Sequence, residues 1–269
     1  MEAVRKQGLG VVAISYDSVG ALKNFGDRQH ITYPLLSDTD SKIIRAYGIL
    51  NETVKPYTTV FGIPYPGVYV VDVQGRVVAK YFEDDYADRV STADILARQF
   101  GAGIVAARGV TETKHLQITT AASNDIARPG LRIVLSLDIQ LKPGMHVYAP
   151  GVQGYIPIDW QLDPGGPAAK RHPFEYPASE MLRLEAIGET VPVYRDHIAL
   201  QREITFGQQG ALKPLISPGG ELIVKGMFRY QACDDQKCYI PQDVPLEWRF
   251  KYEGLDRQRV PSELQHKPN

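Results

Sequence analysis

The spacing of apolar residues divides the chain into two regions of different character. Over residues 1–105, short apolar runs alternate with segments of helical periodicity, which is typical of an α/β unit. The expected elements are a strand at Leu9–Ser15, a helix capped by Asp17 or Ser18 and running to Arg28, an extended piece at Tyr33–Leu36, a helix capped by Asp40 or Ser41 and closed by Gly48, a hairpin of Gly67–Val73 with Arg76–Phe82, and a closing helix at Asp88–Phe100.

In the second region, apolar and polar residues alternate in short segments that Pro- and Gly-rich turns separate. Two-residue periodicity with few helix-length stretches is typical of an antiparallel β-sandwich. Gly101–Thr113 is small and weakly patterned, and we expect it to be the linker between the regions. The expected strands are His115–Thr120, Leu131–Leu141, Ile156–Leu162, His197–Phe206, Glu221–Tyr230 and Val244–Tyr252.

These patterns predict a domain at residues 1–105, a domain at residues 114–252 and a polar tail at residues 253–269, in which we expect Pro261–Asn269 to fray. A length of 269 residues fits two domains of ordinary size. The segment Met1–Gly8 has no apolar signal core and reads as the end of a helix, so no signal peptide is visible. We therefore expect the first domain to begin in mid-element, truncated at its N-terminus.

The bulk composition excludes several classes of function. A net charge of −1 gives no electrostatic footprint for nucleic acid or for an anionic membrane. The longest apolar runs, such as Gly67–Val71, are far shorter than the ~18 residues of a membrane helix. We expect no nucleic-acid partner and no membrane span in this chain.

The only two cysteines, Cys233 and Cys238, have four residues between them. This spacing suits a disulfide across a tight turn, which can be a structural link or a reversible two-electron carrier. A loop of about six residues stabilises the fold by only ~2 kcal/mol in the chain-entropy model, and a sandwich hardly needs so small a contribution. Lys237 would lower the thiol pKa of Cys238, whereas Asp234 and Asp235 would raise it. The two effects oppose each other, and both roles of the pair stay open.

Metal binding is a weaker alternative for the cysteines. A structural zinc site takes four ligands, often in two close pairs. The chain has one cysteine pair, and its six histidines are scattered without His-x3-His spacing. We expect no metal site and no cofactor.

Several motifs of the first region occur in an order known from one redox family. They are Val11–Ser18, Tyr33–Asp38, Ala46–Gly48, Gly62–Asp72 and Gly75–Val77. Over about the first 100 residues they resemble the AhpC/TSA redoxin family, the peroxiredoxin-like members of the thioredoxin fold. The resemblance implies an incomplete thioredoxin-like α/β domain, because the family's peroxidatic cysteine lies upstream of these motifs.

The same resemblance singles out Pro66, because the family's proline before the Val-Tyr-Val-Val strand is often cis and borders the active site. A peroxidase needs a thiolate, and no cysteine occurs before Cys233. We expect no peroxidase activity from this chain, and we expect Pro64, Tyr65 and Pro66 to serve as turn and packing residues. A fragment of a longer product would reverse that expectation.

The segment around the cysteines carries a more specific motif. A resemblance to the N-terminal domain of DsbD-type thiol–disulfide interchange proteins rests on Tyr230–Cys233, Cys238–Pro241, Leu141–Tyr148 and Val193–Asp196. It covers about residues 114–252. The resemblance implies an immunoglobulin-like antiparallel β-sandwich that passes electrons between a membrane partner and extracytoplasmic thioredoxin-like proteins.

Carried over residue by residue, this resemblance makes Cys233 and Cys238 a redox pair in which Cys238 forms mixed disulfides. Tyr148 matches an aromatic residue near the pair, and His146 stands where the family typically has tyrosine. Lys237 and Tyr239, which flank Cys238, complete the candidate site.

The family's protective aromatic cap would fall near Ala186–Gly188, where this chain has no aromatic residue. The loop between the cysteines is also one residue shorter than in the best-known members. Both departures put the shielding of the disulfide, and the efficiency of exchange, in question.

We therefore favour a thiol–disulfide exchange protein that forms transient mixed disulfides with a thioredoxin-like or other redox protein. The resemblance implies a periplasmic or otherwise extracytoplasmic location. One alternative is a partner-binding β-sandwich with a structural disulfide. A further alternative is a fragment of a peroxiredoxin-type antioxidant enzyme.

Overall fold

The computed structural model describes residues 2–58, 60–82, 87–100, 104, 106–184 and 188–266. The chain forms two compact units, one of residues 1–86 with 256–269 and one of residues 87–255. These limits differ from the sequence-based boundaries at 105 and 252. The helix expected to close the first region belongs to the second unit, and most of the expected tail belongs to the first.

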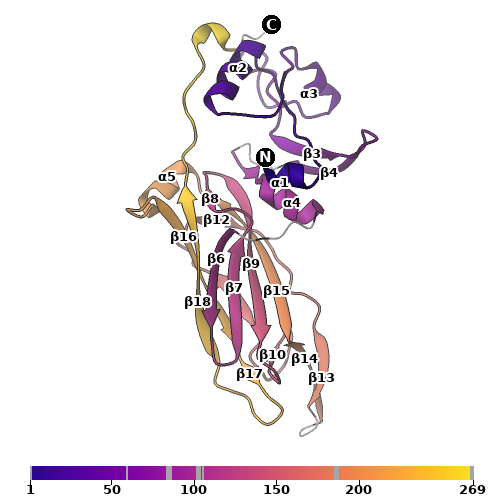
Figure 1. Cartoon of the computed structure of the whole chain (residues 1–269), viewed down its shortest axis with the longest axis vertical. Helices are drawn as coiled ribbons and strands as arrows, with labels where there is room; N and C mark the ends of the chain where they lie inside the picture. The colour runs from indigo at the N-terminus through magenta and orange to yellow at the C-terminus, as the bar shows by residue number, and fades with distance from the viewer. Residues whose placement is uncertain are drawn as a thin grey trace. The chain divides into compact units, whose positions relative to one another are not determined.

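The first unit is an α/β unit with two small separate sheets (Figure 1). β1 and β2 pair in parallel, β3 and β4 form an antiparallel hairpin, and the described residues show no pairing between the two sheets. Its elements are α1 Glu2–Lys6, β1 Ala13–Ser15, α2 Val19–Arg28, β2 Leu35–Ser37, α3 Lys42–Ala46, β3 Gly67–Val71, β4 Val77–Phe82 and the 3₁₀ turn η2 Ser262–Leu264.

Side-chain hydrogen bonds cap the N-terminal ends of α2 and α3. Ser18 caps α2 as expected, since its hydroxyl accepts a hydrogen bond from the Ala21 backbone N–H at 3.2 Å. Of the two expected caps of α3, Asp40 is confirmed: its carboxylate accepts from the backbone N–H of Lys42, the first residue of the helix, at 3.3 Å. Ser41 does not cap through its side chain; it has a left-handed backbone, with φ of 55°, and its hydroxyl donates to the Gly62 carbonyl. The carboxylate of Asp38, which was not expected here, accepts from the next two backbone N–H groups, those of Ile43 and Ile44.

The C-terminal segment packs on the first unit, so the expectation that Pro261–Asn269 frays is wrong for residues 261–266. Asp256 forms an ion pair with Arg28 at 3.0 Å, and the Leu264 carbonyl accepts from the Ser18 hydroxyl. The ring of His266 lies 4.4 Å from that of Tyr16, measured between centroids. The polar composition of the segment concealed these contacts, because each depends on residues more than 200 positions away.

The second unit is an antiparallel β-sandwich. Its elements are β5 Arg89–Val90, α4 Thr92–Phe100, β6 Ala106–Glu112, β7 Leu116–Ala122, β8 Ile126–Ala127, β9 Leu131–Leu141, β10 His146–Tyr148, β11 Asp159–Leu162, β12 Ala168–Arg171, β13 Glu180–Leu184, β14 Glu189–Arg195, β15 His197–Phe206, α5 Gln209–Leu212, η1 Lys213–Leu215, β16 Glu221–Tyr230, β17 Ala232–Cys233 and β18 Gln242–Tyr252. The long strands β9, β15 and β16 have the bounds that the sequence predicted.

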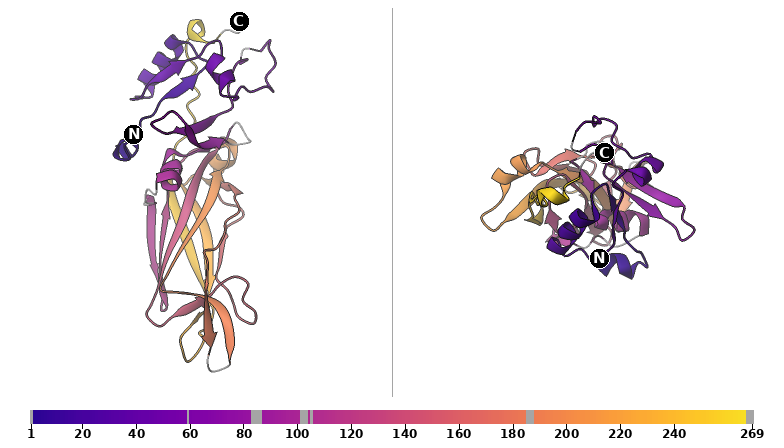
Figure 2. Two further views of the ribbon diagram at one scale, coloured as in Figure 1. Left: turned by 90° about the vertical axis from the view of Figure 1, so that its right-hand side faces the viewer. Right: turned by 90° about the horizontal axis from the view of Figure 1, so that it is seen from above.

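Three sheets make up this sandwich, and two views show their layering (Figures 1 and 2). The largest has the order β12-β15-β9-β7-β6, with β5 paired to β9. The second has the order β11-β16-β18-β8 and the third the order β13-β14-β10-β17. The third sheet carries Cys233 on its edge strand β17, and Cys238 faces Cys233 in an isolated bridge.

One apolar core joins the three sheets. Trp160 of β11 and Trp248 of β18 are buried and stacked, with ring centroids 5.8 Å apart, which confirms their expected core role. Phe206 and Phe250 meet edge to face at 5.2 Å. The strict alternation of β16 and β18 buries every second side chain here, which is what fixes their register.

The expected linker was partly wrong. Residues 106–112 form β6, an edge strand paired with β7. Its pattern is weak because an edge strand contacts the core less, and because Gly109 packs closely: a Cβ there would lie 2.9 Å from the Thr120 hydroxyl. Arg98 of α4 pairs with Asp94 on its own helix and with Glu203 of β15, which fixes α4 to the sandwich.

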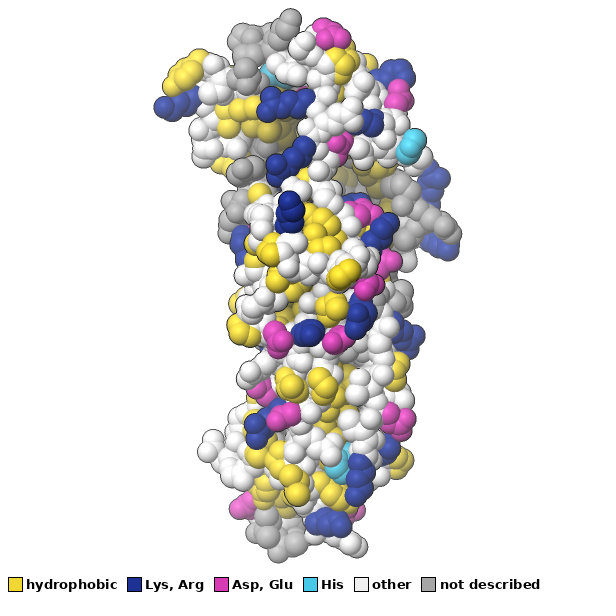
Figure 3. Space-filling view, turned by 90° about the vertical axis from the view of Figure 1, so that its left-hand side faces the viewer, with side chains coloured by type: hydrophobic (Ala, Val, Ile, Leu, Met, Phe, Trp, Pro, Cys, Tyr) yellow, Lys and Arg dark blue, Asp and Glu magenta, His cyan; other side chains and the backbone are white. Residues whose placement is uncertain are grey.

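Charges on the surface are mixed. On the face seen in Figure 3, Lys and Arg side chains are interspersed with Asp and Glu, without a large area of one sign. This mixed distribution agrees with the near-neutral net charge of −1.

We predict that Phe250→Ala lowers the free energy of unfolding of the sandwich by about 3–5 kcal/mol, because it leaves a cavity beside Phe206. Urea unfolding followed by tryptophan fluorescence measures this unit alone, since Trp160 and Trp248 both lie in it. The control is Val110→Ala at an exposed position of β6, which should change stability by less than about 0.5 kcal/mol. A loss below about 1 kcal/mol for Phe250→Ala would contradict the assigned core.

Candidate functional site

The candidate site is a disulfide between Cys233 and Cys238, with Sγ atoms 2.03 Å apart and Cα atoms 4.0 Å apart. The two residues face each other in an isolated antiparallel bridge. The Asp234 N–H donates to the Lys237 carbonyl, and the Tyr239 N–H donates to the Ala232 carbonyl. The sequence-based expectation of a disulfide across a tight turn is confirmed.

The two sulfur-bearing residues differ in their access to solvent. Cys233 lies in β17, pairs with β10 and is only 1% exposed. Cys238 follows the turn and is exposed. A thiolate can reach a disulfide only along the S–S axis at an accessible sulfur. Cys238 is therefore the sulfur open to attack from solution, and Cys233 is the sulfur held inside.

The hydroxyl group of Tyr148 contacts both sulfur atoms of the disulfide. It lies on β10, is 1% exposed, and its hydroxyl oxygen is 3.3 Å from each Sγ. Burial raises the pKa of Tyr148 to about 12, with smaller contributions from Tyr155 and Glu189. The phenol is therefore protonated at neutral pH and can donate a hydrogen bond to sulfur.

His146 lies on the same strand, two residues before Tyr148. It is 3% exposed and stands directly opposite Cys233 in the β10–β17 ladder. Its ring meets that of Tyr148 edge to face, with centroids 5.6 Å apart. Burial lowers the pKa of His146; Arg195 lowers it too, whereas Asp235 and Asp234 oppose the shift. The imidazole is neutral at pH 7.

The turn between the cysteines is held by Asp234. Its carboxylate accepts from the backbone N–H groups of Gln236 and Lys237 and from the Tyr239 hydroxyl, each at 2.8 Å. The Tyr239 hydrogen bond, followed by the two backbone bonds, lowers the pKa of Asp234. From the sequence, Asp234 was predicted only as a charge near the thiol. Its role in closing the turn was not predicted.

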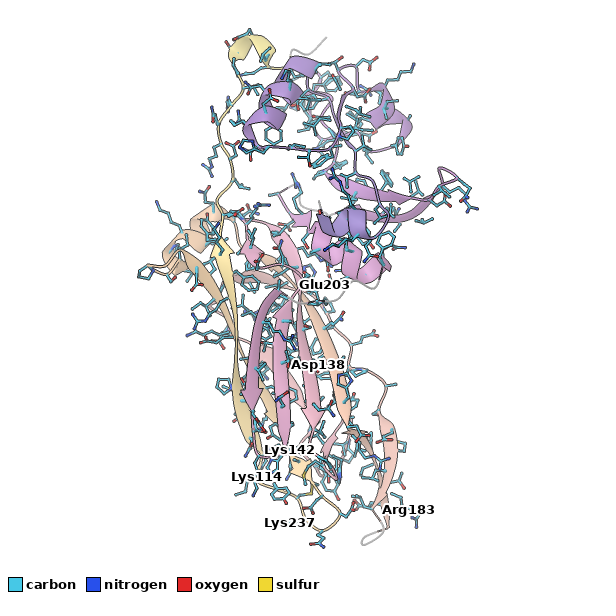
Figure 4. The ribbon with its side chains drawn as sticks, viewed as in Figure 1. Lys114, Asp138, Lys142, Arg183, Glu203 and Lys237 are labelled. Atoms are coloured by element: carbon cyan, nitrogen blue, oxygen red, sulfur yellow. A yellow bond between two sulfur atoms is a disulfide. The ribbon has the colours of Figure 1, made fainter. Side chains whose placement is uncertain are left out.

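Two lysines at this end of the sandwich, Lys114 and Lys237 (Figure 4), lie near the ring of Tyr239. The Nζ atoms of Lys237 and Lys114 lie 5.2 Å and 5.3 Å from the centroid of its ring, within range of cation–π attraction. The ring of His115 lies 4.5 Å away between centroids. Lys237 and Tyr239 are thus brought together beside Cys238, as the site prediction grouped them.

The residues before Cys233 anchor the turn to the core. Tyr230 is fully buried, and its hydroxyl contacts Gln242 at 2.6 Å and Thr113 at 2.9 Å. Gln231 donates from its side-chain amide to the Tyr239 carbonyl at 3.2 Å. Both residues belong to the Tyr-Gln-x-Cys motif, so the sequence did mark them. Their role in anchoring the turn was not predicted.

A second aromatic residue covers Tyr148. The ring of Tyr155 stacks on it, with centroids 4.3 Å apart, and the Tyr155 hydroxyl donates to Glu189 at 3.1 Å. The family resemblance places an aromatic cap near Ala186–Gly188, and residues 186 and 187 of that segment lie outside the described residues. Tyr155 comes from a loop more than 30 residues earlier, so local sequence gave no signal for it.

Pro66 belongs to the first unit, immediately before β3. Pro66 was the candidate for the family's cis proline, and no described peptide bond is cis. Next to it, Leu50 and Pro64 form an antiparallel bridge, and the Tyr65 N–H donates to the Ile49 carbonyl.

The described residues contain no group of three or more His, Cys, Asp and Glu side chains that could hold a metal ion. In the same part of the chain, no helix is both long and apolar enough to cross a membrane.

Comparison with known families accounts for both units. A model of the AhpC/TSA family matches residues 1–80, and a model of the family "Thiol:disulfide interchange protein DsbD, N-terminal" matches residues 113–246. The chain joins an AhpC/TSA region to a DsbD N-terminal region. The first is a partial thioredoxin-like unit, and the second is the β-sandwich that carries the disulfide.

The AhpC/TSA region is similar to curated peroxiredoxins. A putative peroxiredoxin of Mycobacterium tuberculosis is 39% identical over 75 residues, which are 28% of this chain and 47% of that protein. Peroxiredoxin Bcp of Escherichia coli is 26% identical over 90 residues, 32% of this chain and 53% of that protein. The chain spans about half the length of these relatives.

Among solved structures, the N-terminal periplasmic domain of ScsB from Proteus mirabilis is 17% identical, with a TM-score of 0.39. The match covers 52% of this chain and 49% of that one.

We predict that Tyr148→Phe slows reduction of the Cys233–Cys238 disulfide by 2-mercaptoethanol roughly tenfold, because the departing thiolate loses a hydrogen-bond donor. Free thiols counted after acid quench give the rate. The matched control is Tyr194→Phe, which loses a buried hydroxyl bond to the Pro177 carbonyl on the core face of the same sheet. Equal rates for all three proteins would remove Tyr148 from the site.

Proposed function

We propose that the chain is a thiol–disulfide exchange protein in which Cys238 reacts with the partner and Cys233 resolves the mixed disulfide. The observation that carries this proposal is the unequal access to the two sulfurs: Cys238 is exposed and Cys233 is 1% exposed. An inert structural disulfide has no need of one open sulfur, whereas a relay requires an open sulfur for attack and a protected one for resolution.

The exchange moves two electrons. A partner thiolate attacks Cys238 Sγ, the bond to Cys233 breaks, and Cys233 leaves as a thiolate beside the Tyr148 hydroxyl. A second thiol of the partner then attacks the partner sulfur that is bonded to Cys238. The bond to Cys238 breaks, and Cys238 leaves as a thiolate. The partner ends as a disulfide and this chain as a dithiol. The same steps in reverse oxidise this chain and reduce the partner.

The match to the DsbD N-terminal family supports a partner class and a compartment. DsbD-type interchange makes a thioredoxin-like protein with two thiols a fitting partner. A disulfide persists in an oxidising compartment, so an extracytoplasmic, periplasmic location suits the Cys233–Cys238 pair. The AhpC/TSA region serves as a scaffold or docking surface in this proposal, because residues 1–86 contain no cysteine to attack a peroxide.

We predict that Cys233→Ala, reduced and then exposed to glutathione disulfide, accumulates a stable mixed disulfide through Cys238 that intact-mass analysis and peptide mapping detect. The wild type passes through the same adduct and returns to the intramolecular disulfide. Cys238→Ala is the matched control, and it should form the adduct at least about tenfold more slowly, because its remaining thiol is buried.

Absence of an adduct in Cys233→Ala would contradict the proposed exchange and favour a structural disulfide. Equal adduct formation by Cys233→Ala and Cys238→Ala would contradict the assignment of Cys238 as the reacting sulfur.

A further inference from the structure

His146 is a buried histidine with unused hydrogen-bonding capacity. His146 is only 3% exposed, and its Nε2 atom has no hydrogen-bond partner among the described residues. Buried polar atoms are almost always paired, so an unpaired one indicates a role that the resting structure does not use. This nitrogen is not needed to hold the sheet, since the backbone of β10 makes the ladder bonds.

The register of the sheet places His146 beside the buried sulfur-bearing residue. His146 and Cys233 are directly opposite each other in an antiparallel pair, so their side chains share one face and their Cβ atoms are about 4.5–5.5 Å apart. Tyr148, two residues along β10, shares that face and touches both sulfurs. The imidazole therefore stands next to the place where the Cys233 thiol forms when the disulfide opens.

The thiolate, not the thiol, is the attacking form of a cysteine, and an ordinary cysteine thiol is mostly protonated at neutral pH. Cys233 packs against Val191 and Val193, whose apolar side chains cannot accept its proton. A reduced, buried Cys233 therefore needs a proton acceptor close by before it can react. Tyr148 cannot accept its proton, because a neutral phenol with a pKa of about 12 is a donor at this pH.

We propose that His146 accepts the proton of the Cys233 thiol when Cys233 resolves a mixed disulfide at Cys238; this rests on the exchange function proposed above. The proton moves from Cys233 Sγ to the imidazole as the sulfur electron pair attacks Cys238 Sγ. The bond between Cys238 and the partner sulfur breaks, and the partner leaves as a thiolate. The imidazolium then returns its proton to solvent.

The charges around His146 keep it ready to accept a proton. Burial lowers its pKa, and Arg195, opposite it on β14, acts in the same direction. Arg195 is itself paired with Glu180 of β13. Asp234 and Asp235 in the turn oppose the shift without reversing it. The base is neutral above its lowered pKa, so its contribution is present at pH 7 and is lost as the pH falls through that value.

The test is the pH dependence of the resolving step in the full chain. Reduced protein is mixed with excess 2-hydroxyethyl disulfide, a neutral probe, and quenched in acid at intervals; intact mass separates the Cys238 adduct from the reclosed disulfide. With His146 as base, the wild-type resolving rate is nearly flat between about pH 7 and 8, because the imidazole is already neutral.

In His146→Gln the Cys233 thiolate must form by ionisation alone. Its resolving rate should rise about tenfold per pH unit below the thiol pKa, and should be about 100-fold below wild type at pH 7. His197→Gln is the matched control: it removes an exposed histidine of β15, paired with Asp138, and should keep the wild-type profile.

A wild-type rate that itself rises tenfold per pH unit would overturn the proposal, and this result does not depend on whether His146→Gln folds. Equal rates and slopes in wild type and His146→Gln would overturn it as well. Failure of every variant, Cys233→Ala included, to form the Cys238 adduct would contradict the exchange function itself. Normal adduct formation with an unchanged profile in His146→Gln would contradict the role of His146 alone.

Discussion

The pairing of β17 with β10 is the constraint on which the site depends. It fixes Cys233 as part of a sheet and buries it, while the tight turn that follows brings Cys238 back to the same place but leaves it exposed. The backbone thus gives the two cysteines different environments although only four residues separate them. A disulfide between two loops would not impose such a difference.

On the face of the sheet around Cys233, two polar side chains, Tyr148 and His146, lie among apolar ones. Tyr148 is a protonated donor next to both sulfurs, and His146 is a neutral imidazole opposite Cys233. Burial causes both states: it disfavours the phenolate and it disfavours the imidazolium. In the proposed exchange, the same low-dielectric surroundings leave Tyr148 able to donate a hydrogen bond and His146 able to accept a proton.

How far the sequence predicted the structure depended on the range of the interactions involved. The bounds of β9, β15 and β16 were predictable because alternation along a single strand reports which face is buried. The contribution of Asp38 to the start of α3, and the bond from Ser41 to the distant Gly62 carbonyl, were not predictable, because both depend on how the chain folds around the helix. The position of the C-terminal segment on the first unit was hidden for the same reason.

In the candidate site, too, residues in local motifs were predictable and residues in long-range contacts were not. The cysteine pair, and through resemblance Tyr148 and His146, could be found from motifs, because those residues lie in segments with a specific pattern. Tyr155 could not, since it reaches Tyr148 from a loop with no motif of its own. The unequal exposure of the two cysteines, on which the proposed function rests, is a property of the sheet edge that no spacing of residues encodes.

The reduction potential of the Cys233–Cys238 disulfide tests the central claim most directly. It can be measured by equilibrating the full chain with glutathione or dithiothreitol redox buffers and counting reduced protein by mass after alkylation. We expect a value above about −300 mV, in the range where redox proteins exchange disulfides. A value well below about −300 mV would identify a structural disulfide and contradict the assignment of the pair as an electron carrier.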